Sequence, residues 1–284
     1  MPNPITILKR HLKIRENRRR IQASATDARP TVIVYQMGKV ASSSIYHSLQ
    51  KYPDACHGFH THILNPDRIR ARDHGNKHPL LNPDKRNRRS HDLSRYIIEP
   101  RHPAKIITLV RDPFARNISA FFENSASIAA APTDQDAAME YLQKAFLAET
   151  NLSHADYWFK EEFNRALGLD IFAHEYDPAR GWCRFSSAPY DVLVLDTSLP
   201  DEEKSRCISE FVGIPEFQLD RHNTNPPGGR LELYQAFKAY IRLPKSVVDE
   251  VLNTCYSEHF FEEKTRQAFR EQWQAPNPPE PCDR

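Results

Sequence analysis

The sequence lacks a long hydrophobic run, and its few cysteines are scattered. No stretch is apolar over the length that a membrane span or a signal peptide requires, so we expect a cytoplasmic protein without a membrane span. The cysteines are odd in number and never form a CxxC pair, which argues against a disulfide framework and against a zinc module. They are Cys56, Cys183, Cys207, Cys255 and Cys282.

The net charge is only +2, but the basic residues are unevenly distributed. With 284 residues and 39% hydrophobic content, the chain has enough apolar surface for one enzyme domain. We expect residues 1–30 to form a basic, helical arm. Residues 68–101 form a second basic stretch, the basic insertion, which reads as loop-rich up to Asp92, and it either holds a polyanionic acceptor or is merely solvated. The basic residues are Lys9, Arg10, Lys13, Arg15, Arg18, Arg19 and Arg20 in the arm, and Arg68, Arg70, Arg72, Lys77, Lys85, Arg86, Arg88 and Arg89 in the insertion.

Residues 32–49 predict a strand, a turn and a helix in succession. The segment opens with VIVY, an apolar run typical of a buried strand, and Ile45 and Leu49 resume the apolar pattern at helical spacing. Gly38 frees the backbone to turn, while Lys39 and three serines lie where a helix N-terminus leaves N–H groups unpaired. A phosphate would be held at such a turn. The predicted anion-binding residues are Gly38, Lys39, Val40, Ala41, Ser42, Ser43 and Ser44.

This turn differs from the nucleoside-triphosphatase loop GxxxxGK[ST]. In that motif a hydroxyl residue follows the lysine at once, and another glycine lies five positions before the second one. Here Val40 and Ala41 follow Lys39, and no glycine precedes the strand. An ordinary strand-to-helix connection is the alternative reading.

A second strand-to-helix junction follows residues 105–110, which read KIITLV. Asp112 is placed as a helix N-cap and Pro113 as the first helical residue. Arg111 therefore stands at the carboxyl end of a strand, and Ser119 lies about two turns into the next helix. The alternative is an Arg111 paired with Asp112 and a Ser119 that only solvates the helix.

Residues 56–64, CHGFHTHIL, predict another strand between these two junctions. Strand alternation puts His60 and His62 on one face and Thr61 on the other. A neutral imidazole suits general-base catalysis because its pKa lies near neutral pH. A metal-binding pair and solvated histidines are the alternatives. Because no third ligand follows at metalloenzyme spacing, we expect no metal.

The remaining pattern predicts a parallel α/β sheet with a helical C-terminal part. Residues 190–196 read as a strand and residues 200–213 as a capped helix. In residues 151–169, three apolar side chains share one helical face, whereas Trp158, Glu161 and Glu162 receive no role. Ligands bind at the carboxyl edge of such sheets, where both junctions lie. The loop of residues 221–230 has the composition of a lid, and residues 274–284 form a Pro-rich tail.

These segments resemble PAPS-dependent sulfotransferases, in which PAPS is 3′-phosphoadenosine-5′-phosphosulfate. The turn around Lys39 looks like their 5′-phosphosulfate loop, and Arg111 with Ser119 looks like their 3′-phosphate site. The His-x-His element resembles that of uronyl 2-O-sulfotransferases. Three segments are most similar in sequence to bacterial capsular polysaccharide synthesis proteins, a sulfotransferase-like group. They read QMGKVASSSI, LVRDPFARNISAFF and HADYWFKEEFNRALGLDIF.

The resemblance covers residues 31–273 and implies one domain with the P-loop-like sulfotransferase fold, a parallel sheet flanked by helices. It implies PAPS as donor and a carbohydrate hydroxyl as acceptor, as in polysaccharide biosynthesis, with no nucleic-acid partner. His62 would be the catalytic base, next to His60, and Lys39 would stabilise the leaving phosphate. Arg221 and Thr224 of the lid would contact the donor. The rivals are a P-loop kinase with magnesium at Asp112 or Asp196, and a non-catalytic glycan-binding module.

Overall fold

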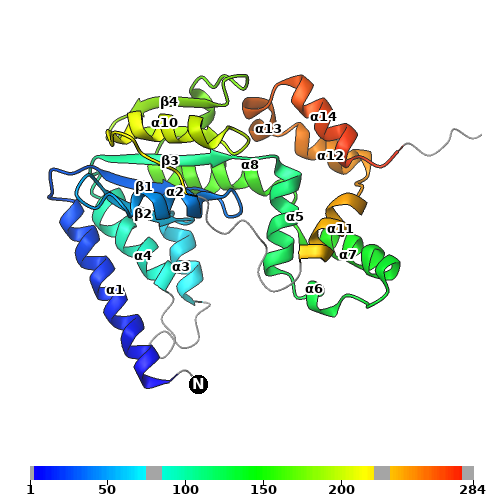
Figure 1. Cartoon of the computed structure of the whole chain (residues 1–284), viewed down its shortest axis with the longest axis horizontal. Coiled ribbons are helices and arrows are strands. Elements are labelled where there is room, and N and C mark those ends of the chain that lie inside the picture. Colours follow the sequence, from blue (N-terminus) through cyan, green and yellow to red (C-terminus); the bar gives the residue numbers. More distant parts are fainter. Residues whose placement is uncertain (1–2, 75–84, 221–230, 277–284) are drawn as a thin grey trace, which may run out of the picture. The chain divides into compact units, whose positions relative to one another are not determined.

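The computed structural model describes residues 3–74, 85–220 and 231–276. Within them, one five-stranded sheet has the order β2-β1-β3-β5-β4 (Figure 1). The first four strands in that order pair in parallel, and β4 pairs with β5 antiparallel at the edge. The strands are β1 Thr31–Tyr35, β2 His57–Thr61, β3 Ala104–Val110, β4 Trp182–Ser187 and β5 Tyr190–Asp196. The prediction of an α/β protein with a mostly parallel sheet is confirmed.

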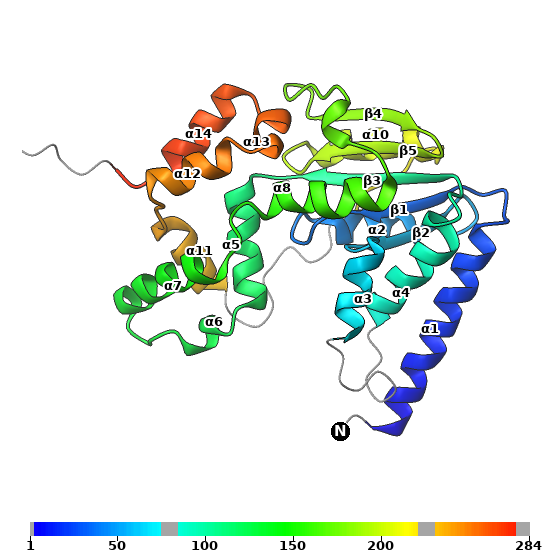
Figure 2. The ribbon, with the colours of Figure 1, turned by 180° about the vertical axis from the view of Figure 1, so that it is seen from behind.

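The chain divides into two compact units. The first comprises Met1–Arg111 and Tyr157–Thr224 and contains the sheet, with α10 on one face and the helical segment 157–167 on the other (Figures 1 and 2). Its helices are α1 Pro4–Ser24, α2 Ser42–Leu49, α3 Pro66–His74, α4 Lys85–Leu93, η1 Ser94–Ile98, the end of α8 His154–Trp158, η2 Phe159–Asn164, α9 Arg165–Leu167, η3 Ile171–Ala173 and α10 Asp201–Val212.

The second unit, Asp112–Asp156 and Asn225–Arg284, is helical in its described residues. Aromatic side chains fill its core, among them the buried Phe114, Phe121, Phe146, Phe237 and Trp273. Its helices are α5 Pro113–Asn124, α6 Ser127–Ala130, α7 Gln135–Glu149, the start of α8, α11 Leu231–Tyr240, α12 Lys245–Leu252, α13 Cys255–Phe260 and α14 Glu263–Trp273.

The central strands are apolar on both faces because helices cover both sides of a parallel sheet. Every residue of β1 is buried, and so are all but one of β3. In the register, Val34 lies opposite His60 and Tyr35 opposite Thr61. The chain therefore leaves β1 and β2 at the same edge of the sheet, and the residues that follow each strand come together there.

Three expectations need correction. In the described part of residues 68–92, α3 and α4 replace the predicted loop, because Pro66 and the side chain of Asn65 start α3 and the buried Ile69 and Leu93 anchor the two helices. The strand predicted over residues 56–64 is only β2. The antiparallel β4 was not predicted, because its residues are half-exposed and show little apolar alternation. Lys77 lies outside the described residues.

Among the helices that the structure describes, none combines the length and the apolar character needed to cross a membrane.

Candidate functional site

The turn that follows β1 has an unusual backbone. Lys39 has φ 73° and Ala41 has φ 58°, so both adopt the left-handed conformation that non-glycine residues rarely take. The left-handed residues of the turn are thus Lys39 and Ala41, whereas Gly38 has no positive φ. A Cβ atom at Gly38 would meet nothing within 4 Å, so no close contact in the chain requires a glycine there. Strain of this kind is typical of ligand-binding turns.

This turn leads into the N-terminus of α2. The N-cap residue is Ala41, whose methyl side chain cannot accept a hydrogen bond from the first N–H groups of the helix. Ser42 and Ser44 are buried, and Ser43 is half-buried. Val40 is completely buried, so it offers no surface to a ligand in this structure. The α2 terminus thus offers N–H groups, hydroxyls and Lys39 to an anion.

Gln36, which sequence reasoning did not select, joins this turn to the histidine pair. Its buried side-chain Nε2 lies 3.1 Å from His60 Nε2 and 3.2 Å from His62 Nδ1, and it contacts Ser42 Oγ. Ser42 Oγ also lies 3.0 Å from His60 Nε2. The sequence could have pointed to Gln36 through its position directly after a buried strand, at the sheet edge where ligands bind.

The two imidazoles make different hydrogen bonds. Their ring centroids are 4.7 Å apart, as the shared strand face predicts. His62 Nδ1 lies 2.9 Å from the backbone oxygen of Gln36, an acceptor, so Nδ1 carries the proton and Nε2 is the basic nitrogen. His60 instead turns its Nε2 toward Ser42 and Gln36. Of the pair, His62 therefore has the nitrogen that is suited to take a proton.

Both histidines are held in the neutral form. Burial is the main cause that lowers the pKa of His60 to about 2, and His62, Arg89 and Arg86 add to the effect. Burial also lowers the pKa of His62, although its hydrogen bond to the Gln36 backbone opposes the shift. A neutral imidazole is the form that acts as a base.

Helices α3 and α4 surround the histidines with positive charge. Arg72, Arg86 and Arg89 each disfavour the protonated form of His62. The guanidinium of Arg89 lies 5.7 Å from the centroid of the Tyr46 ring, and that ring stacks on His60 at 5.6 Å. The basic insertion thus adjoins the histidine pair.

Arg111 connects the second predicted junction to the first. It follows β3, and its Nη1 donates a hydrogen bond of 2.7 Å to the backbone oxygen of Lys39, 72 residues away in sequence. Asp112 is the N-cap of α5, as predicted. Its Oδ1 accepts from the N–H groups of Phe114 and Ala115, and its Oδ2 accepts from Trp273 Nε1. The start of α5 is therefore already neutralised by a carboxylate.

Three other predicted site residues lie outside the described part of the first unit. Ser119 lies half-buried on α5 in the second unit. Arg221 and Thr224 lie outside the described residues. Within the part of the chain that the structure describes, there is no group of three or more His, Cys, Asp or Glu side chains that could hold a metal ion.

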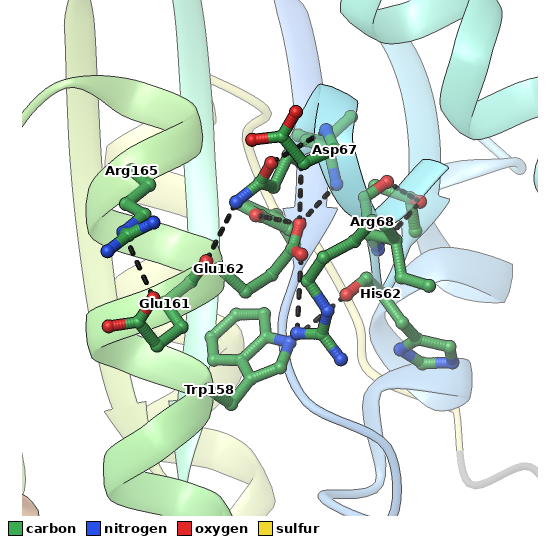
Figure 3. Close-up of polar contacts among 12 residues, drawn as sticks. His62, Asp67, Arg68, Trp158, Glu161, Glu162 and Arg165 are labelled. Carbon is green, nitrogen blue, oxygen red and sulfur yellow. Dashed lines mark hydrogen bonds and ion pairs between the residues drawn. The ribbon is translucent and has the colours of Figure 1, made fainter. Parts of the chain in front are cut away.

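A buried carboxylate holds the loop that carries His62 (Figure 3). Glu162 is completely buried, and its Oε1 accepts hydrogen bonds from the Tyr35 hydroxyl at 2.7 Å, Leu64 N at 2.5 Å and Asn65 N at 2.8 Å. Its Oε2 lies 3.3 Å from Arg68 Nη1. Three donors and a guanidinium offset the cost of burying this charge.

Two further contacts fix the same loop. Trp158 Nε1 donates to the backbone oxygen of His62 at 3.0 Å, and Asn65 Nδ2 donates to the backbone oxygen of Glu161 at 2.8 Å. Figure 3 shows Trp158 and Glu162 reaching from one helix toward the loop that carries His62. Sequence analysis gave Trp158 and Glu162 no role. The available signal was an acid at position 162 on the apolar face formed by Phe159 and Phe163.

One family model matches residues 133–262, and its description is "Putative capsular polysaccharide synthesis protein". The matched segment is less than half of the chain and contains Trp158 and Glu162. It does not reach Lys39, the two histidines or Arg111, so the match and the motifs concern different parts of the sequence. No curated protein and no solved structure matches the chain.

Proposed function

We propose that this chain transfers a sulfuryl group from PAPS to a hydroxyl of a carbohydrate. One observation carries the proposal: Gln36 connects the anion-binding turn to both histidines, since its side chain contacts Ser42 and His60 and its backbone oxygen accepts from His62 Nδ1. An anion site and a candidate base then lie in one hydrogen-bonded cluster, as a transfer from an anionic donor to a hydroxyl requires. The family match, through its description, suggests the carbohydrate-related role.

The donor would supply an electrophilic sulfur with a phosphate as leaving group. Lys39, the serine hydroxyls and the N–H groups of α2 would hold the phosphosulfate, and they would stabilise the charge that develops on the phosphate. Arg111 would bind the 3′-phosphate of the donor. The chemistry of these donors fits an anion, because an ammonium, a guanidinium and N–H groups all favour negative charge.

His62 would act on the acceptor. Its Nε2 would take the proton of the attacking hydroxyl, while Nδ1 stays bonded to the Gln36 backbone and fixes the ring orientation. His60 would hold Ser42 in place for the donor. Because Arg72, Arg86 and Arg89 create positive potential around His62, an acidic sugar is the acceptor that the site favours.

The two rivals make different demands on these residues. A magnesium-dependent kinase would need a carboxylate at a strand end, yet Asp112 is engaged by three donors, and Asp196 Oδ1 accepts from the N–H of Ser198 at 2.7 Å. A non-catalytic glycan-binding module would need the basic surface but not Lys39. Neither rival gives a reason for the link between Ser42 and His60.

Incubation with ³⁵S-labelled PAPS and a panel of acidic and neutral glycans tests the proposal. We expect label transfer without magnesium, preferably to acidic glycans, and a loss of at least tenfold in Lys39→Ala. Lys51→Ala is the matched control, because this lysine lies just past α2 and is exposed. Phosphoryl transfer from magnesium ATP would instead establish the kinase. Glycan binding that is unchanged in Lys39→Ala, without any transfer, would favour the binding module.

A further inference from the structure

Helix α1 exposes a stripe of aliphatic side chains. Ile5, Leu8 and Leu12 are 62%, 60% and 55% exposed. Among the described residues, the other large hydrophobic side chains that are exposed are all tyrosines. At 3.6 residues per turn, Ile5, Leu8 and Leu12 fall within about 60° of the helix circumference. Three neighbouring apolar side chains that are each more than half exposed are unfavourable in water, so this face is suited to a partner.

The opposite side of α1 is attached to its own unit. Ile21 is completely buried and Ile14 half-buried, and the Arg18 guanidinium lies 3.0 Å from the buried carboxylate of Asp92 on α4. Figures 1 and 2 both show α1 alongside α4, with no labelled element on its outer side. The exposed stripe is therefore presented by a helix that is fixed on its other face.

Basic residues flank the stripe on both sides. By helical position, Arg15 lies at one border and Lys9 and Lys13 lie at the other. The whole helix has seven Lys or Arg residues and one Glu, a net charge of +6. An apolar stripe between cations is the pattern of helices that lie in the plane of a membrane interface.

We propose that this face of α1 docks on a membrane surface that is rich in anionic phospholipids. The stripe would enter the headgroup region, and the flanking ammonium and guanidinium groups would contact lipid phosphates. A second copy of α1 fits less well, because two helices of charge +6 would face each other. Nucleic acid would satisfy the charges but would leave the aliphatic stripe in water. This inference does not depend on the proposed transferase activity.

Sedimentation of the full chain with vesicles tests the docking. We expect binding to phosphatidylcholine vesicles that contain about 30% phosphatidylglycerol, weak binding to pure phosphatidylcholine, and release at 1 M salt. The triple variant Lys9→Gln, Lys13→Gln, Arg15→Gln should bind roughly 100-fold more weakly, at about 1 kcal/mol per cation. The variant Ile5→Ser, Leu8→Ser, Leu12→Ser should lose at least tenfold.

A matched control neutralises three other exposed cations, Lys51, Arg165 and Lys264, and should bind as the wild type does. All variants change exposed side chains and should keep the wild-type melting temperature. In Leu8→Trp, the added tryptophan emission should shift to the blue on anionic vesicles alone. The proposal would be overturned if the control variant lost as much vesicle affinity as the triple variant, or if the wild type bound equally well to neutral and anionic vesicles. A dimer of the wild type that the serine variant dissociates would also overturn it.

Discussion

Replacing Glu162 is the most direct test of how the His62 loop is held. In Glu162→Ala, the Tyr35 hydroxyl and the N–H groups of Leu64 and Asn65 lose their acceptor, and all three residues are buried. Each buried group left unsatisfied costs about 1–3 kcal/mol, and breaking a buried ion pair costs about 3–5 kcal/mol. Because Arg68 is 31% exposed and can be hydrated, we expect a loss near the lower end, about 3 kcal/mol.

Urea unfolding followed by tryptophan fluorescence measures this loss. Glu162→Gln should lose less, because the amide oxygen can still accept from part of the loop. Glu161→Ala is the matched control: its side chain is partly exposed and pairs with Arg165 at 3.0 Å, so its removal should cost about 0.5 kcal/mol. A loss below about 1 kcal/mol in Glu162→Ala, or equal losses at both positions, would refute the role of this carboxylate.

Three further predictions concern the site. His62→Ala should lower kcat by about 10²- to 10⁴-fold with little change in donor affinity, while His60→Ala should lower the affinity for the donor. Full turnover of His62→Ala would show that another residue is the base. The pKa of His60 is depressed in the folded state, so the unfolding free energy should fall as pH drops below 6.5, and His60→Gln should flatten that dependence in urea titrations between pH 7 and 5. Arg111→Ala should weaken calorimetric binding of adenosine 3′,5′-bisphosphate at least tenfold, whereas unchanged affinity in the folded variant would exclude a 3′-phosphate site there.

Local rules were sufficient for much of the fold. The apolar runs that became β1, β3 and β5 have no polar face, and only a covered parallel strand accommodates them. Asp112 before Pro113 marks a helix start through a short-range hydrogen bond, so no tertiary information is needed. The shared face of His60 and His62 follows from strand alternation in the same way.

The features that were not predicted depend on contacts distant in sequence. The three hydrogen-bond donors to Glu162 are 97 to 127 residues away in sequence, and no local pattern shows that Tyr35 lies next to it. Gln36 is one polar residue among many until the β1–β2 register brings it to His62. The basic insertion reads as loop because few of its residues are apolar, yet Ile69 and Leu93 are enough to anchor two helices.

The π-helical turn η2 sets the direction in which Glu162 points. The hydrogen bonds of such a turn span one residue more than those of an α-helical turn. Deleting Lys160 would let the segment rewind as an α-helix, and because the helix beyond η2 would keep its phase, the displacement would fall on the residues within η2, including Glu162. The carboxylate would then leave its three donors although no contact residue had been changed. The length of this helix is therefore as strict a requirement as the identity of the acid it carries.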